Sequence, residues 1–369
     1  LLAALAGGIR TREEILRDIA PLFPDRFRLE PGSVNNIATI DRHFKIPQVW
    51  KSSLAVDYRL PLPFNSLLTL EGMFIKDLNA IVQRDMNVIS NDDGKMSRFT
   101  GADNRYRYPG NTEKRIHEEI TNAILMDNSG KGYSANFNVT LNMEPIAGLG
   151  FMTAYTYTTS RTMTDNRSNQ VDNAWMQEPS VMGPNNQELH HPQYMQTPHR
   201  VISQINYTRT YARHFTTSVA IFYEGQYAGN YSYLYNTDMN NDGINYDLIY
   251  IPRNRNELHF ADNKVGNATF TAEEQRDAFW TFVNQDPYLK KHKGEYAEAY
   301  AAYLPWFNRF NLRVVQDFKI RTGKVNNTLQ VSVDIMNAGN LINNSWGVSK
   351  VATAGNNGKL LQLKEVNEA

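Results

Sequence analysis

The sequence predicts an all-β fold: an antiparallel up-and-down transmembrane β-barrel, of which this chain supplies about 8 to 10 strands of a larger barrel. Three observations lead to this prediction. Polar and apolar residues alternate strictly over long stretches, the connections between these stretches are alternately short and long, and many aromatic residues (20 Tyr, 17 Phe and 5 Trp) accompany a mean hydropathy of −0.53. Alternating strands combine these properties more readily than a helical core does.

The clearest alternation runs over the twelve residues from Tyr133 to Glu144. It would give a strand one apolar and one polar face. An ordinary strand has ~5 to 6 residues, whereas ~9 to 11 are needed to cross a bilayer at a tilt. Weaker alternation predicts further strands at 53–60, 68–74, 149–157, 201–210, 215–226, 310–320 and 328–336.

The connections between these strands differ in length in a regular order. Short turns are expected at 60–66, 144–148, 211–214 and 321–326, and long loops at 87–130, 161–198 and 227–307. All long loops would therefore lie at one end of the sheet, as the extracellular loops of outer-membrane barrels do. A soluble antiparallel β-sandwich, which also alternates, is the competing interpretation.

Capping boxes predict short helices outside the strands. Thr11 with Glu14 begins one at 11–20, and Thr271 with Glu274 begins another inside the longest loop. We therefore divide the chain into a loop region with a short helix, 1–47, and the carboxy-terminal part of a β-barrel, 48–369. The first six residues lack a charged segment before an apolar run, so we expect a cut point inside a longer protein rather than a signal peptide.

Composition excludes several classes of protein. The 369 residues include 38 basic and 38 acidic side chains, so nothing favours nucleic acid as a partner. With no cysteine, disulfide frameworks and thiol catalysis are excluded. No apolar run approaches the ~18 residues of a membrane helix.

The stretch 236–254 is the strongest candidate for a cation site. Asp238, Asn240, Asp242 and Gly243 have the spacing of the first half of a calcium loop, in which alternate oxygen ligands converge and glycine allows the bend. The bidentate glutamate of the second half is missing, so Asp247 would have to close the site. The alternative is an Asn/Asp turn that hydrogen-bonds its own backbone, without a metal.

The sequence gives no positive evidence for catalysis, and we predict that the protein is not an enzyme. His117 and Glu118 begin a pattern typical of zinc peptidases, but Thr121 stands where the second histidine ligand is needed. A cluster of loop histidines at 190, 191 and 199 would suit a transition metal, or would simply be solvated.

Aromatic residues near the ends of the loops are the candidate substrate contacts. An aromatic face offers a large contact area to a sugar or peptide at low entropic cost. They would equally suit the interfacial girdle of a barrel. The candidates are Trp175, Tyr231, Tyr233, Tyr235 and Trp306.

Several stretches resemble the carboxy-terminal barrel half of TonB-dependent outer-membrane transporters, nearest the Oar-like and SusC-like members. They are FKIPQVWKSSLAVDYRLP, GYSANFNVTLNMEP with GLGFMTAYTYTTS, TPHRV, NNDGINYDLIYIP, PWFNRFNLRVVQDF and SVDIMNAGNLIN, and they span most of residues 40 to 345. Asp238, Asn240, Asp242 and Asp247 match a loop motif of the family, Pro198, His199 and Arg200 a strand-start motif, and Asp334, Asn337 and Asn340 a turn motif.

The resemblance implies a receptor of the cell outer membrane that imports a large nutrient, such as a glycan, a peptide or a chelated metal. Its partners would be outer-membrane lipid, an amino-terminal plug domain, the remaining barrel strands, TonB and a surface lipoprotein lid. We find no plug domain and no TonB box in these residues, so we expect a fragment that supplies barrel wall and substrate-contacting loops. The alternative is a soluble or surface-attached β-sandwich that binds carbohydrate.

Overall fold

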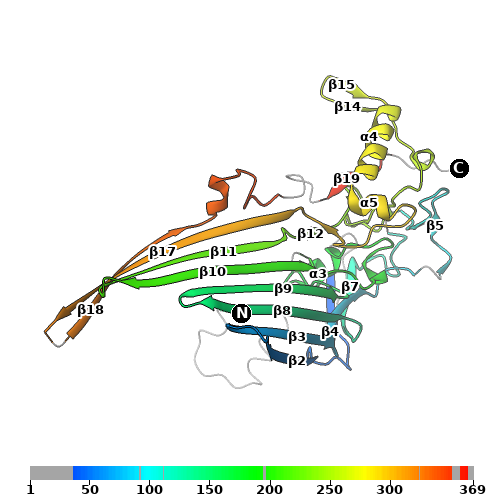
Figure 1. Cartoon of the computed structure of the whole chain (residues 1–369). Helices are drawn as coiled ribbons and strands as arrows, with labels where there is room; N and C mark the ends of the chain where they lie inside the picture. The colour runs from blue at the N-terminus through cyan, green and yellow to red at the C-terminus, as the bar shows by residue number, and fades with distance from the viewer. Residues whose placement is uncertain are drawn as a thin grey trace, which may run out of the picture.

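The computed structural model describes residues 36–90, 93–110, 112–193, 197–323, 325–350 and 358–364. Most of the regular structure is β, and its centre is one eight-stranded antiparallel sheet (Figure 1). The helix expected at 11–20 lies outside the described residues. Among the described residues, no helix is long and apolar enough to cross a membrane.

The eight strands of this sheet are the eight that alternation predicted, each pairing with the next along the chain. They are β2 (Val49–Arg59), β3 (Asn65–Asp77), β8 (Tyr133–Ile146), β9 (Leu149–Arg161), β10 (His199–Tyr211), β11 (Phe215–Tyr227), β17 (Trp306–Thr322) and β18 (Val325–Ile335). The up-and-down antiparallel order is thus confirmed. Within the described part of the chain, β2 and β18 each pair on one side only, and the sheet is open.

The pairing register assigns every side chain of the sheet to one of its two faces. Leu141 of β8 lies beside Leu68 and Thr153, and its neighbour Asn142 lies beside Leu67 and Met152. We call the face with Leu141 the apolar face and the face with Asn142 the polar face. Followed across all eight strands, the apolar face carries Leu54, Val56, Leu68, Leu70, Phe137, Val139, Leu141, Phe151, Tyr155, Val201, Ile205, Tyr207, Val219, Ile221, Phe310, Leu312, Val314, Leu329, Val331 and Val333.

All four short connections lie at one end of the sheet and the long ones at the other, as predicted (Figure 1). We call these the turn end and the loop end. Between β10 and β11 the chain reverses tightly, and Ala212 and Arg213 have φ values of 48° and 60°. Two successive residues with positive φ fit the right-handed twist of the flanking strands.

The long connections fold together into what we call the loop cap, the described residues of 78–132, 162–198 and 228–305. Its strands β7 (Asn122–Ser129) and β4 (Ala80–Asp85) form a three-stranded sheet with β1 (Asn36–Ile40), which lies outside these connections. The order is β1, β7, β4, with β1 parallel to β7. The region 1–47, expected to be loop and helix, therefore contributes a strand to this sheet.

The remaining elements are short and most lie in the loop cap. They are β5 (Ser97–Arg98), β6 (Tyr106–Arg107), α3 (Val171–Met176), η3 (Pro184–Asn186), β12 (Asn230–Tyr231), β13 (Leu234–Tyr235), η4 (Arg255–Glu257), β14 (Asn263–Val265), β15 (Ala268–Phe270), α4 (Ala272–Gln285), α5 (Pro287–Lys291), β16 (Ala302–Tyr303), η5 (Ala338–Leu341) and β19 (Lys359–Leu361). Helix α4 begins at the predicted capping box, in which Thr271 and Glu274 bond each other's backbone N–H groups.

Candidate functional site

The main hydrophobic core of the described chain lies in the loop cap rather than on the sheet. Its centre is formed by Ile249, Ile251, Val283 and Leu289, which are fully buried. These residues come from the stretch after the Asp/Asn loop and from α4 and α5. The longest loop is therefore a packed structure that holds its polar residues in fixed positions.

The three tyrosines at 231, 233 and 235 lie inside this core. The Tyr231 and Tyr233 hydroxyls are 2.8 Å apart, and Tyr233 donates a hydrogen bond of 2.6 Å to Asp286 Oδ2. Tyr235 donates to Asp103 Oδ2 over 3.3 Å. Tyr233 and Tyr235 are buried and Tyr231 is partly buried. Their role as substrate contacts stays a prediction, and their observed role is to hold the loop cap together.

The two tryptophans predicted with them are in different environments. Trp175 is buried in a smaller cluster with Ile124 and Ile244, and its Nε1 donates to Asn185 Oδ1 over 2.9 Å. Trp306 is exposed at the loop end of the apolar face, edge-on to Tyr227 with the ring centroids 5.3 Å apart. This position matches the girdle interpretation of the aromatic residues.

The Asp/Asn loop folds on its own backbone. Asp238 accepts from the N–H of Gly243 over 2.6 Å, and Asp242 accepts from the N–H of Ile244 over 2.7 Å. Asp247 closes the loop by accepting from the N–H of Met239 over 2.7 Å. These are the hydrogen bonds of the Asn/Asp turn interpretation.

The carboxyl groups of this loop are buried near one another, and both effects raise their pKa values. Burial raises the pKa of Asp242 to about 7, with a further contribution from the charge of Asp238. Burial also raises the pKa of Asp247 to about 8, with Asp242 adding to the shift. Asn240 is fully buried, and its Nδ2 has no hydrogen-bond partner. Within the described residues, no group of three or more His, Cys, Asp or Glu is arranged to hold a metal ion.

Arg105 connects this loop to a second long loop, and sequence reasoning did not identify it. Its side chain is fully buried, pairs with Asp103 at 2.9 Å, and donates to the carbonyl of Leu248 over 2.8 Å. Its Nη1 lies 3.9 Å from Asp247 Oδ1, so it partly offsets the buried negative charge. Arg105 and Asp247 are 142 positions apart, and no local sequence pattern indicates that they lie close together. Only the three-dimensional structure reveals this contact.

The loop histidines do not meet at one point. His190 is buried, with Nε2 3.5 Å from Glu178 Oε2, whereas His199 lies on the apolar face against Tyr155. Burial raises the pKa of Glu178 to about 7, and burial lowers the pKa of His190. At pH 7 an imidazole shifted in this direction is neutral, and a carboxyl with a pKa of about 7 is about half protonated.

The polar face ends beneath the loop cap in a charged cluster. Glu224 is buried and bonds Arg200 at 2.6 Å on one side and Arg309 on the other. Two cations around one carboxylate leave a net positive charge at this point. The strand-start residue Arg200 is therefore part of the polar face of the sheet.

Comparisons of the chain with models of protein families, with curated proteins and with solved structures gave no match.

Proposed function

We propose that this chain forms part of the wall and the outer mouth of a β-barrel in the cell outer membrane. The observation that carries the proposal is the exposed apolar face of the eight-stranded sheet. Leu54 is 75% exposed, Phe137 46% and Leu329 61%, and they lie on strands at both edges and in the middle. In water, such exposure would be strongly unfavourable.

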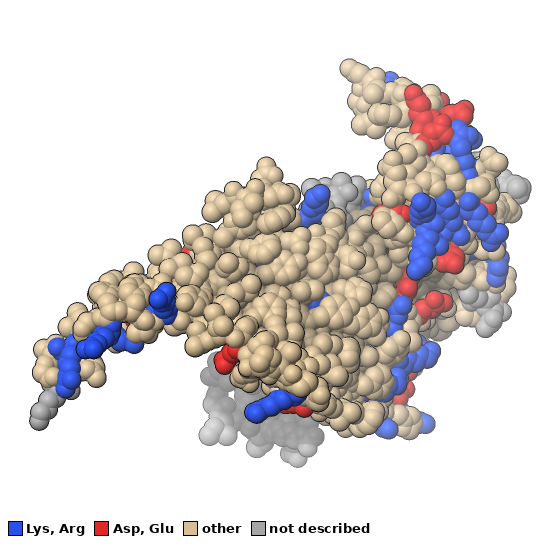
Figure 2. All heavy atoms as spheres, in the orientation of Figure 1, with Lys and Arg blue, Asp and Glu red and all other residues tan. Residues whose placement is uncertain are grey.

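The size of this apolar face favours lipid over water as its surroundings. Eight strands about 4.8 Å apart span roughly 38 Å, and with an apolar band about 25 Å tall the face covers roughly 900 Å². The largest apolar patch of a soluble monomer is typically about 300–600 Å². Figure 2 shows that charged side chains gather at the loop end and around the tip of the β17–β18 hairpin, with few on the visible sheet face. Hydrocarbon is the environment that suits this distribution.

The polar face and the loop cap supply the inner surface and the mouth in this proposal. Along the polar face, Asn136 donates to the Thr158 hydroxyl over 2.8 Å and Thr156 donates to Asn138 Oδ1 over 3.0 Å, in the manner of a hydrated lumen wall. Closure of the wall would require further strands beside β2 and β18, whose outer edges are unpaired in the described chain. The loop cap would meet the substrate from outside.

The TonB-dependent part of the proposal rests on the resemblance of the sequence stretches described above. We propose that the complete receptor takes up a large nutrient, with energy that TonB delivers through a plug domain. The packed loop cap supports this role because it would hold a stable binding surface above the lumen. The substrate class stays open among glycan, peptide and chelated metal.

A carbohydrate-binding β-sandwich is the second candidate. A sandwich buries its apolar face against a second sheet. In the described residues, the other sheets have two or three strands, and the apolar face is exposed at its centre. This observation favours the barrel.

Cell fractionation with heat-modifiable gel migration tests the proposal. The protein should partition into the detergent-extracted outer membrane and migrate differently before and after boiling. Recovery as a soluble monomer that unfolds cooperatively without detergent would refute the barrel, and binding to immobilised glycan would then support the sandwich.

A further inference from the structure

The apolar face carries an isolated positive charge at its turn end. In the described sheet, the pairing register places Lys76, Arg161 and Arg209 on this face. Lys76 donates to the carbonyls of residues 131 and 132, and Arg161 pairs with Glu298, all at the loop end. Arg209 lies at the opposite end, two residues before the end of β10, and no ion pair joins it to another described residue.

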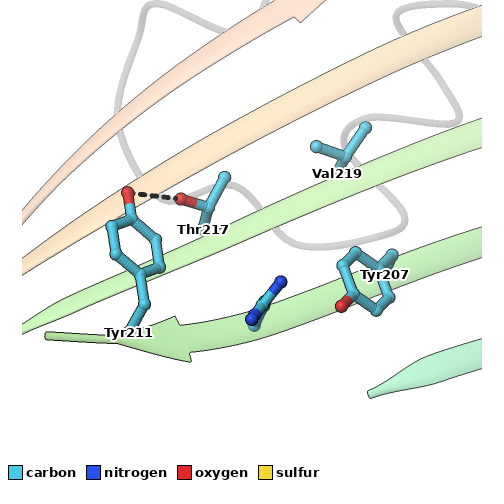
Figure 3. Close-up of a pocket in the computed structure, with 5 residues that line it drawn as sticks. Tyr207, Tyr211, Thr217 and Val219 are labelled. Atoms are coloured by element: carbon cyan, nitrogen blue, oxygen red, sulfur yellow. Dashed lines mark hydrogen bonds between the residues drawn. The ribbon is translucent and has the colours of Figure 1, made fainter. Parts of the chain in front are cut away.

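A pocket surrounds Arg209. It has a volume of about 440 Å³, opens to the surface, and is lined by Tyr207, Arg209, Tyr211, Thr217 and Val219 (Figure 3). All five belong to the apolar face of β10 and β11. The pocket is therefore outside the polar lumen and on the surface that would meet lipid.

Hydrogen bonds hold one wall of this pocket in place. Thr217 Oγ1 donates to the Tyr211 hydroxyl over 3.1 Å (Figure 3). That hydroxyl in turn donates to Gln316 Oε1 over 3.3 Å. The Tyr211 ring also stacks on Phe215 with the centroids 5.7 Å apart. Tyr211 is thus fixed beside the guanidinium, and the wall does not depend on a ligand for its shape.

The level of the pocket along the strand, relative to the membrane of the proposed barrel, indicates the kind of ligand it would bind. At about 3.3 Å per residue, Arg209 lies roughly 7 Å from the end of its strand, where a barrel meets the headgroup region. Tyrosines are enriched at this level, and a long basic side chain reaches along apolar surface to place its charge there. The cation, the aromatic walls and the apolar floor of Val219 together match a headgroup attached to acyl chains.

We propose that this pocket binds the phosphate group of a membrane phospholipid in the periplasmic leaflet, with Arg209 as the anion-binding residue. This inference rests on the proposed barrel, because the short-turn end of an outer-membrane barrel faces the periplasm. Arg209 bonds the phosphate oxygens, the Tyr207 and Tyr211 rings enclose the headgroup, and the acyl chains lie along the apolar face toward Ile205.

Lipid titration of the detergent-purified receptor, followed by native mass spectrometry, tests this site. Phosphatidylglycerol is the probe, and the variants are Arg209→Gln and Arg59→Gln. Arg59 is a matched control because it lies near the turn end of β2 but on the polar face. We expect Arg209→Gln to weaken the tightest binding about fivefold, which corresponds to one basic residue at a membrane surface, and Arg59→Gln to leave it unchanged.

Three outcomes would refute the phospholipid site while leaving the proposed barrel unaffected. Equal binding by Arg209→Gln and the parent protein removes Arg209 from the site. If both variants lose the same affinity for phosphatidylglycerol, the effect depends on net charge rather than on this pocket. If inorganic phosphate competes fully with phosphatidylglycerol, the acyl chains are not needed for binding. Heat-modifiable migration of every variant is measured alongside, since its absence would instead refute the barrel on which the inference rests.

Discussion

At the scale of single residues, the loop cap depends on one buried cation. Arg105 is surrounded by Asp103, Asp247 and two aromatic rings, with its guanidinium carbon 5.2 Å from the Tyr235 centroid and 5.1 Å from the Tyr296 centroid. Burying a charge is costly unless it is paired, and removing one partner leaves the other uncompensated. The side chain therefore links two loops that are far apart in sequence.

We predict that Arg105→Ala destabilises the loop cap by about 3–5 kcal/mol, because it leaves the Asp103 carboxylate and the buried Leu248 carbonyl without their partner. Hydrogen exchange at Ile249 and Ile251, whose N–H groups bond Tyr233 and Glu295, measures this loss directly. Arg255→Ala is the control, since Arg255 pairs with Asp277 on the surface. Equal protection of both variants would contradict the structural role of Arg105.

The carboxyls of the Asp/Asn loop predict a pH dependence. A carboxyl whose folded pKa is raised favours folding when protonated, so its contribution is complete below pH 4 and is lost as pH rises through the folded pKa. With values of about 7 and 8 for Asp242 and Asp247, the loop should lose stability as the pH rises from about 4 to about 8. Between pH 6 and pH 9 the loss spans about one pH unit for Asp242 and about two for Asp247, which is on the order of 4 kcal/mol at about 1.4 kcal/mol per unit.

Limited proteolysis of the folded receptor at pH 6 and pH 9 measures this dependence. Cleavage within 236–251 should be faster at pH 9 in the parent protein, and Asp247→Asn should reduce the difference. Asp277→Asn, which changes an exposed carboxyl on α4, should leave it intact. A loop that is cleaved at the same rate at both pH values would contradict the raised pKa values.

Calcium gives a separate prediction for the same loop. Because the carboxylates already accept backbone N–H groups, we expect the loop to resist proteolysis equally in chelator and in millimolar calcium. Protection that appears only with calcium, and that Asp242→Asn abolishes, would establish the calcium interpretation.

At the scale of elements, the eight long strands were predictable because each carries its own alternation. A register shift of one residue would move every apolar side chain to the other face, so the pairing follows once the strands are known. The loop cap was not predictable in this way. Strand β1 pairs in parallel with β7, 86 residues away (Asn36 with Asn122), and such non-local contacts leave no periodic signal in either segment.

The tyrosines of 231–235 illustrate the same limit at the candidate site. Their place near the end of a loop suited either a substrate contact or an interfacial girdle. Helices α4 and α5 cover Tyr233, with the Phe282 ring edge-on to it and the Tyr288 ring stacked on it. The covering helices lie about 50 positions further along the chain, beyond what a local pattern reveals.

Adjacent residues of β8 provide a matched test of the two faces. Leu141→Arg would place a charge on the apolar face near the middle of the strand, at a cost of about 2–4 kcal/mol in a bilayer. Asn142→Arg would place the same charge on the polar face, where we expect little effect. Urea titration of the protein folded into lipid vesicles compares the two. Equal destabilisation would contradict the assignment of lipid and lumen to these faces.

At the scale of the whole molecule, the two ends of the sheet have different tasks in the proposed receptor. The turn end is short and regular, whereas the loop end holds the folded core and most of the buried charged groups (Figure 1). A rigid cap over a sheet that is apolar on one side and polar on the other fits a membrane protein that binds its substrate at one surface.

The most direct test of the barrel uses single cysteines, because the natural sequence contains none. Spin labels placed one at a time from residue 134 to residue 143 of β8 would be probed in the membrane-embedded receptor with oxygen and with a water-soluble nickel reagent. The apolar face predicts high oxygen accessibility at 135, 137, 139, 141 and 143, and nickel accessibility at the positions between them. Equal access of the water-soluble reagent to both sets would contradict the membrane-spanning sheet.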